Sequence, residues 1–370
     1  MRFYIGLFAL FAVLTLCLPM IGGFDSFKAA IPPQPSLPAS SATEKAEAPQ
    51  AAKEIATEVA EKAAERRKEE KAAEEDATKA KPYKNADDEF KILNKASGEV
   101  ENVSRKDYVR GAVCAEMPPR FHTQALAAQA LAANTYALRC KKEQEQKRDP
   151  ALLGADFACD PDNWHGYVTE AQAKKRFGEK FTVYWGKICR AADMGGDYVA
   201  VYGGEPIVAA YHSLSGGKTE SASNVWQGNA PYLAPAESFG DTLAEGFESS
   251  AVFTAAEVKE ILLSENPKIS LNKNCKKWFD ITKHSPSGYV LEVKCGGKAL
   301  SGIDMRRVFK LRSSNFTIGC DGKSFTFTVK GYGHGVGLSQ YGADYMARQG
   351  ADFKEIAMHY YTGCELQKIA

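Results

Sequence analysis

A stretch dominated by Ala, Glu and Lys, residues 43–80, restricts what this 370-residue chain can fold into. These residue types are strong helix formers, but the stretch has too few Leu or Ile side chains to give a helix an apolar face. We therefore predict a solvated single helix or a disordered tether there, since a coiled coil would need an apolar seam. The Pro-, Ser- and Ala-rich residues 31–42 predict an extended spacer. Residues 25–88 are thus expected to be a stalk or linker, and residues 89–370 a globular domain.

Residues 3–21 form an uncharged, mostly apolar run that follows Arg2. Its length is just sufficient for a membrane-spanning helix, so we predict an N-terminal membrane anchor over residues 1–24. A cleaved signal peptide is an alternative, although Gly22-Gly23-Phe24 is a poor cleavage site. A lipoprotein signal is a further alternative, which Leu16 before Cys17 disfavours. The basic residue before the span favours a single-pass protein of the cell membrane with its globular domain outside the cytoplasm.

Charge and cysteine content narrow the choice of partners and compartment. The net charge is only +1, from 47 basic and 46 acidic residues, so we expect no nucleic-acid partner. Eight cysteines follow the predicted anchor, and an even number in an exported domain permits disulfides. Buried free thiols are the alternative, and the sequence does not reveal any pairing. These cysteines are Cys114, Cys140, Cys159, Cys189, Cys275, Cys295, Cys320 and Cys364.

The globular region mixes helical and strand patterns. Ser104 is a suitable N-cap for a helix over 105–116, which Pro118 ends. A second helix is expected over 123–140, where many small residues predict close packing against another backbone. The segment 198–211 predicts a hairpin around Gly203-Gly204. Further strands are expected at 90–93, 288–294 and 324–330, and helix at 339–361. The fold class is therefore α+β, with mixed helices and antiparallel sheet in one globular domain, preceded by a transmembrane helix and the stalk.

Three motifs carry the chemical information in the chain. The first reads YVRGAVCAEMPP at 108–119 and continues as QALAAQALAANTYAL at 124–138. The second reads YHSLSGGKTE at 211–220 and is followed by Trp226 and Tyr232. The third reads GYGHGVGLSQYGA at 331–343.

These motifs, in this order and over residues 90–370, resemble the stage II sporulation protein D family; the segment RRVFKLRSSNF at 306–316 also fits its pattern. The resemblance implies a lytic transglycosylase, which cleaves the bond between N-acetylmuramic acid and N-acetylglucosamine in peptide-stripped peptidoglycan strands and leaves 1,6-anhydro ends. It also implies work in sporulation and engulfment, beside a cell-wall amidase and other membrane-anchored sporulation proteins. One departure is Asn134, where the family commonly has Arg.

Glu116 is the predicted catalytic acid. Glycoside cleavage needs a protonated carboxyl group that donates to the leaving oxygen. Hydrolases need a second carboxylate as well, whereas a lytic transglycosylase manages with one because the C6 hydroxyl of the muramic acid attacks. A helix C-terminus disfavours the ionised form and so raises the pKa of a carboxyl. Position alone favours the alternative, a Glu that merely ends a surface helix, whereas the resemblance favours the catalytic role.

The predicted substrate-binding residues come from all three motifs. The turn with Ser213 would let a sugar approach the backbone closely, or it is a structural turn; a serine hydrolase would need a triad that is not evident. The glycines around His334 are expected to bend the chain and point polar residues into a groove, although a core histidine is an alternative. Nucleotide binding is not expected, since no Lys-Ser/Thr pair follows. Trp226 and Tyr232 are either sugar platforms or core residues. The predicted set is Gln129, Ser213, Ser215, Gly216, Gly217, Thr219, His334, Ser339, Gln340 and Tyr341.

No metal or other cofactor is predicted. The resemblance implies zinc in some members, bound by His and Cys in the loop after the second helix. Here that loop offers Cys159 and His165, with Asp160 and Asp162 nearby, too few suitable ligands for a four-coordinate structural zinc site.

Two other functions compete with the enzyme. One is a non-catalytic peptidoglycan-binding enhancer of a cell-wall amidase, and the other is a scaffold that acts through its stalk. An intact Glu116 favours the enzyme.

Overall fold

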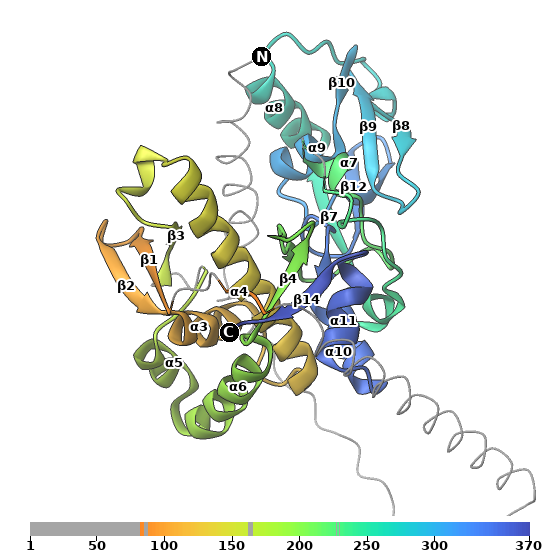
Figure 1. Ribbon diagram of the computed structural model, residues 1–370. Helices are drawn as coiled ribbons and strands as arrows, with labels where there is room; N and C mark the ends of the chain where they lie inside the picture. The colour runs from red at the N-terminus through yellow and green to blue at the C-terminus, as the bar shows by residue number, and fades with distance from the viewer. Residues whose placement is uncertain (1–81, 85–87, 162–165, 227, 229) are drawn as a thin grey trace, which may run out of the picture. The chain divides into compact units, whose positions relative to one another are not determined.

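The computed structural model describes residues 82–84, 88–161, 166–226, 228 and 230–370 (Figure 1). The predicted anchor and nearly all of the predicted stalk lie outside these residues. Within the described ranges, no helix is long and apolar enough to cross a membrane.

The first half of the domain is mainly helical. It contains α3 (Arg105–Glu116), α4 (Thr123–Gln146), α5 (Glu170–Phe177) and α6 (Phe181–Gly195), with short 3-10 helices η3 (Pro150–Leu152) and η5 (Gly178–Lys180). As predicted, the Ser104 hydroxyl caps α3 by accepting from the Asp107 amide at 3.0 Å. Helix α4 continues beyond the predicted end at residue 140, through Lys, Glu and Gln residues that favour helix.

Helix α4 is the centre of the larger hydrophobic core. Its residues from Ala125 to Leu138 are almost all buried, and it contacts α3, α6, β4 (Tyr198–Tyr202) and the C-terminal helices. A methyl group added at Gly195 of α6 would lie 1.9 Å from the Ala127 carbonyl oxygen. The small residues of α4 therefore do allow close helix packing, as the sequence predicted.

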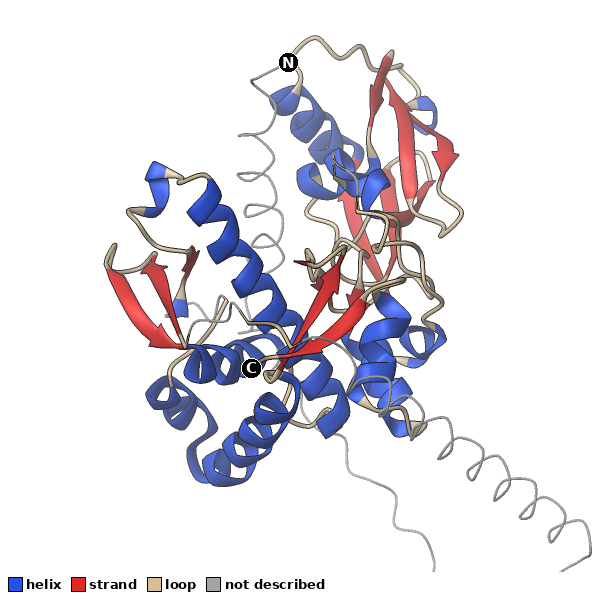
Figure 2. Ribbon diagram, in the orientation of Figure 1, coloured by secondary structure: helices blue, strands red, loops and turns tan. Residues whose placement is uncertain are grey.

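Two three-stranded sheets flank these helices (Figure 2). One has the order β2 (Val100–Ser104), β1 (Glu89–Asn94), β3 (Phe157–Cys159); the other has the order β14 (Glu365–Lys368), β4 (Tyr198–Tyr202), β5 (Glu205–Pro206). The predicted hairpin forms at Gly203-Gly204, both of which have positive φ. It is shorter than predicted, because β6 (Tyr211–His212) instead pairs in parallel with β13 (Leu338–Ser339).

Residues 248–330 build a second hydrophobic core, rich in Phe. Its sheets have the orders β10-β9-β8 and β11-β12-β7. The predicted strands at 288–294 and 324–330 correspond to β9 and β12. The elements are β7 (Glu248–Thr254), α8 (Ala255–Glu265), η7 (Cys275–Lys277), β8 (Phe279–His284), β9 (Val290–Cys295), β10 (Lys298–Leu300), α9 (Gly302–Val308), β11 (Asn315–Cys320) and β12 (Ser324–Lys330).

The C-terminal segment forms two helices where one helical stretch was predicted. Helix α10 (Gln340–Arg348) stops before Gly350, whose φ of +99° breaks the helix, and α11 (Phe353–Tyr360) starts anew at the Asp352 cap. Both helices pack on α4. Two short helices, α7 (Ala222–Val225) and η6 (Phe239–Leu243), follow the second motif. The fold is α+β as predicted, with mainly antiparallel pairing; β1–β3 and β6–β13 are parallel.

Candidate active site

Glu116 is the last residue of α3, where the chain turns away. The next residue, Met117, is extended (φ −126°, ψ 140°), as expected before Pro118. The Glu116 side chain is half-buried, and burial raises the pKa of its carboxyl from 4.5 to about 7. Hydrogen bonds from the Tyr211 side chain and the Gly166 backbone oppose this rise. The carboxyl therefore exists in both protonation states near neutral pH, which suits a group that must donate and then accept a proton.

Tyr211 links the first motif to the other two. Its side chain bonds to Glu116, and its strand β6 is in register with β13, so that Tyr211 pairs with Leu338 and His212 with Ser339. The parallel pairing thus places the second and third motifs side by side next to the catalytic candidate. Tyr211 is the first residue of the second motif, but it is not among the predicted site residues.

Asp241 of η6 ties the second and third motifs together. Its carboxylate is fully buried and accepts hydrogen bonds from the Ser215 amide (2.9 Å), the Ser215 hydroxyl (2.6 Å) and the Ser339 hydroxyl (2.7 Å). Burial raises the pKa of Asp241, while these bonds act in the opposite direction. Asp241 lies outside the three motifs, and no sequence pattern marked it as a site residue.

Four predicted substrate-binding side chains are completely buried. Ser215 and Ser339 bond to Asp241, and the Thr219 hydroxyl accepts from the Ala236 amide at 2.8 Å. The Gln129 side-chain oxygen accepts from Gln340, itself buried, at 3.3 Å. In this structure, these side chains hold loops and helices together, and none of them lines an exposed groove.

Of the two glycines of the second motif, Gly216 packs against residues 248–330 and Gly217 lies next to Thr242 of η6. The Gly216 amide donates to the Tyr289 hydroxyl at 3.2 Å, and a methyl group added there would lie 2.2 Å from the Asn315 side chain. Gly217 has a φ of +100°. Their lack of side chains is therefore used for close contact within the protein. Ser213 is half-buried, and its carbonyl accepts from the Tyr341 amide at 3.2 Å.

His334 is a buried histidine, which is the alternative that the sequence left open. Its ring lies near the rings of Trp226 (5.0 Å between centroids) and His212 (5.6 Å). One ring nitrogen accepts from the Val336 amide at 3.0 Å, and burial holds the pKa of His334 well below its usual range. Burial also lowers the pKa of His212 to about 4. Both rings are neutral at pH 7.

The third motif bends as its glycines predict. Gly331, Gly333, Gly335 and Gly337 all have positive φ. A methyl group at Gly337 would lie 2.1 Å from the Ala210 carbonyl oxygen, so that β13 approaches the chain before β6 as closely as backbones permit. Beyond the bend, the Tyr341 ring is half-buried and packs edge-on against Phe121, 4.8 Å between centroids.

The comparisons with known proteins agree with this arrangement of motifs. A family model described as "Stage II sporulation protein" matches residues 93–202, which include Glu116. The chain is 33% identical over 277 residues to stage II sporulation protein D of Bacillus subtilis (strain 168), covering 75% of this chain and 78% of that protein. The chain belongs to the stage II sporulation protein D family.

Other relatives extend the family comparison. Stage II sporulation protein D of Bacillus amyloliquefaciens is 32% identical over 280 residues, covering 75% of this chain and 78% of that protein. A protein named "Amidase enhancer" from Bacillus subtilis (strain 168) is 26% identical over 309 residues, covering 70% of this chain and 40% of that protein. The resemblance inferred from the three motifs is thus confirmed at the level of the family.

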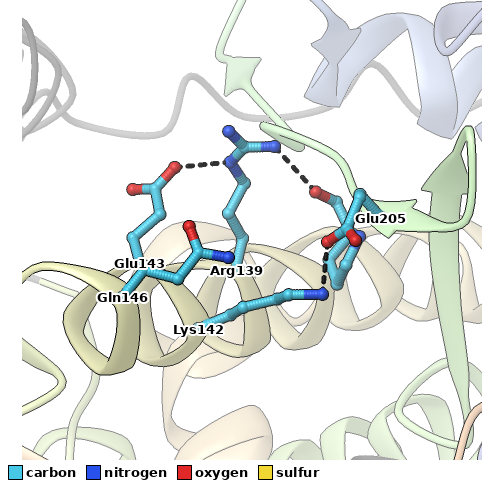
Figure 3. Close-up of a pocket in the computed structure, with 6 residues that line it drawn as sticks. Arg139, Lys142, Glu143, Gln146 and Glu205 are labelled. Atoms are coloured by element: carbon cyan, nitrogen blue, oxygen red, sulfur yellow. Dashed lines mark hydrogen bonds and ion pairs between the residues drawn. The ribbon is translucent and has the colours of Figure 1, made fainter.

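A pocket in this family member lies just beyond the end of the first motif, between the C-terminal half of α4 and β5 (Figure 3). Its charges are paired within it. Arg139 bonds to Glu143 at 2.8 Å and to the Pro206 carbonyl at 2.9 Å, and Lys142 pairs with Glu205. No predicted site residue lines it, so we do not assign it to the active site.

The chain departs from the family pattern at Asn134 and in the loop that would bind zinc. Asn134 is buried, and its amide donates to the carbonyls of Gly196 (3.0 Å) and Tyr198 (3.1 Å), joining α4 to the chain around β4. Of the zinc-ligand candidates, Asp162 and His165 lie outside the described residues. Within the described ranges, no group of three or more His, Cys, Asp or Glu side chains is placed to hold a metal ion.

Proposed function

We propose that this protein is a peptidoglycan lytic transglycosylase with Glu116 as its catalytic group. It would cleave the MurNAc-GlcNAc bond of peptide-stripped glycan strands and leave 1,6-anhydroMurNAc ends. The observation that carries the proposal is the half-buried Glu116 carboxyl, whose pKa of about 7 is close to neutral pH. Membership of the stage II sporulation protein D family supports it.

The proposed mechanism uses one carboxyl twice. Protonated Glu116 donates its proton to the glycosidic oxygen, and the bond from that oxygen to C1 of the muramic acid breaks. The resulting carboxylate then accepts the proton of the C6 hydroxyl, whose oxygen forms the new bond to C1. No water is consumed, and Glu116 ends protonated and ready for the next cycle. Tyr211, by donating to the carboxylate, would stabilise Glu116 between the two proton transfers.

The buried predicted residues have a supporting role in this proposal. Asp241 holds the turn at Ser215 and the junction of β13 and α10 at Ser339, which lie next to the half-buried Ser213 and Tyr341. We infer that Ser213 and Tyr341 contact the glycan strand, whereas the buried hydroxyls fix the shape of its binding surface.

The setting of the activity is also part of the proposal. The apolar run at residues 3–21 would anchor the chain in the cell membrane with the catalytic domain outside the cytoplasm. There it would act on glycan strands during sporulation, beside a cell-wall amidase and other membrane-anchored sporulation proteins.

A non-catalytic enhancer of a cell-wall amidase is the second candidate. The similarity to the protein named "Amidase enhancer" favours it. In that case the domain would bind peptidoglycan without cutting it, and Glu116 would be dispensable.

The test compares the full chain with its Glu116→Gln variant on peptide-free glycan strands, with products read by mass spectrometry. Glu99→Gln, an exposed substitution in the turn before β2, is the matched control. Anhydro-ended products from the wild type and the control, but not from Glu116→Gln, would support the enzyme. Equal products from all three would rule out Glu116 as the acid. Strand binding without products from any of them would favour the enhancer.

A further inference from the structure

Two thiols lie side by side in the second core. Cys275 is the first residue of η7, and Cys320, 45 positions later, is the last residue of β11. Their sulfur atoms are 3.7 Å apart. A disulfide bond is about 2.05 Å long, so less than about 2 Å separates the two sulfurs from bonding distance.

The surrounding packing holds the two thiols in this position. The Cys275 thiol donates to the carbonyl of Gly322, at 3.3 Å, in the turn that joins β11 to β12. Trp278, which directly follows η7, stacks on Phe325 of β12, with centroids 5.5 Å apart and ring planes at 22°. The η7 segment is therefore fixed against the hairpin of which Cys320 is a part.

We propose that Cys275 and Cys320 form a disulfide bond when the protein meets an oxidant of the disulfide class. The proposal does not depend on the proposed function.

The order of the reaction follows from exposure. Cys320 is half-exposed and Cys275 is 8% exposed, so the Cys320 thiolate meets the external disulfide first. Its attack breaks the external S–S bond, forms a mixed disulfide and releases one external thiol. The Cys275 thiolate then attacks the Cys320 sulfur and expels the second external thiol. Two protein thiols are oxidised, one external disulfide is reduced, and the two protons leave on the released thiols.

The cross-link would close a loop containing β8, β9, β10 and α9. That loop carries Tyr289, whose hydroxyl accepts from the Gly216 amide in the second motif. The bond would therefore stabilise the part of the second core that supports this motif.

The experiment treats the reduced full chain with oxidised glutathione and then maps peptides under non-reducing conditions. We expect a peptide pair joined through Cys275 and Cys320, and a thermal midpoint about 5–10 °C above that of the reduced protein. The Cys295→Ser variant is the control, because Cys295 is a buried thiol of the same core; it should still form the link.

Single variants test the order of attack. Cys275→Ser should retain glutathione on Cys320, whereas Cys320→Ser should leave Cys275 unmodified under the same conditions. A Cys275→Ser/Cys320→Ser double variant with the melting point of the reduced wild type would show that folding is intact and should gain nothing from the oxidant. Recovery of both cysteines as free thiols, or their linkage to other cysteines, would overturn the proposal.

Discussion

Replacing Glu116 by Gln should stabilise the protein above neutral pH while it abolishes catalysis. The pKa of Glu116 is 4.5 ordinarily and about 7 in the folded protein, because burial penalises the charged form. Between pH 4.5 and about pH 7, Glu116 therefore keeps its proton in the folded state, whereas it has lost this proton in the unfolded state. The stability that this proton contributes is fully present below pH 4.5 and is lost as the pH rises through 7. Gln keeps the neutral form at every pH.

The size of the effect follows from the shift. Each pKa unit corresponds to about 1.36 kcal/mol, so a shift from 4.5 to about 7 gives at most about 3.4 kcal/mol. Because the side chain is only half-buried, solvent screening reduces this to about 1–2 kcal/mol. The difference in free energy of unfolding between Glu116→Gln and wild type should therefore be larger at pH 8 than at pH 4 by that amount. In a protein of this size, that corresponds to a difference in melting temperature of about 2–6 °C.

Thermal unfolding of both proteins at pH 4, 6 and 8 measures this difference. Glu99→Gln, which changes an exposed side chain, is the control for the loss of one charge. A difference between Glu116→Gln and wild type that stays constant from pH 4 to 8 would refute the argument that burial shifts the carboxyl. Activity on glycan strands supplies a second readout, since the proposed acid step should slow as the pH rises above about 7.

Three further predictions concern the support of the site. Tyr211→Phe removes a hydrogen bond that lowers the pKa of Glu116, so the alkaline limb of the pH–rate profile should move to higher pH by as much as about one unit. An unchanged limb would show that Tyr211 does not stabilise the Glu116 carboxylate. Asp241→Asn replaces a buried acceptor of three hydrogen bonds and should lower the free energy of unfolding by about 2–4 kcal/mol, measured by denaturant titration. It should also reduce activity, measured as the release of products from glycan strands. Gly195→Ala should destabilise the protein by about 3 kcal/mol, because the added methyl group would lie 1.9 Å from a backbone oxygen of α4. Gly186→Ala is the control in the same helix. Its methyl group would have no atom closer than 3.8 Å, so this variant should stabilise the protein by about 0.5–1 kcal/mol. Similar melting temperatures for the two alanine variants would show that α4 and α6 adjust freely.

Much of the local structure was determined by the sequence alone. The Ser104 cap and Pro118 set the ends of α3, and the Gly203-Gly204 pair set the hairpin of β4 and β5. The order and content of the three motifs were enough to predict the family. These features are local because capping, turns and helix ends depend on residues within a few positions of each other.

Only the tertiary structure decided what the motif residues do. It buried Ser215 and Ser339 against Asp241, a residue outside every motif, and it packed His334 into the core. It also divided the predicted single domain into two hydrophobic cores. Periodicity and spacing indicate which face of an element is apolar, but they do not specify the distant partner of a polar side chain.

The same limit applies to Glu116. Its place at a helix end could be read from Pro118, yet its hydrogen bond to Tyr211 joins residues almost a hundred positions apart. Tyr211 lies on β6, whose pairing with β13 is likewise between segments far apart in the sequence. The sequence pointed to Glu116 as the candidate acid, whereas the fold determined the burial and the hydrogen-bond partners that set its pKa.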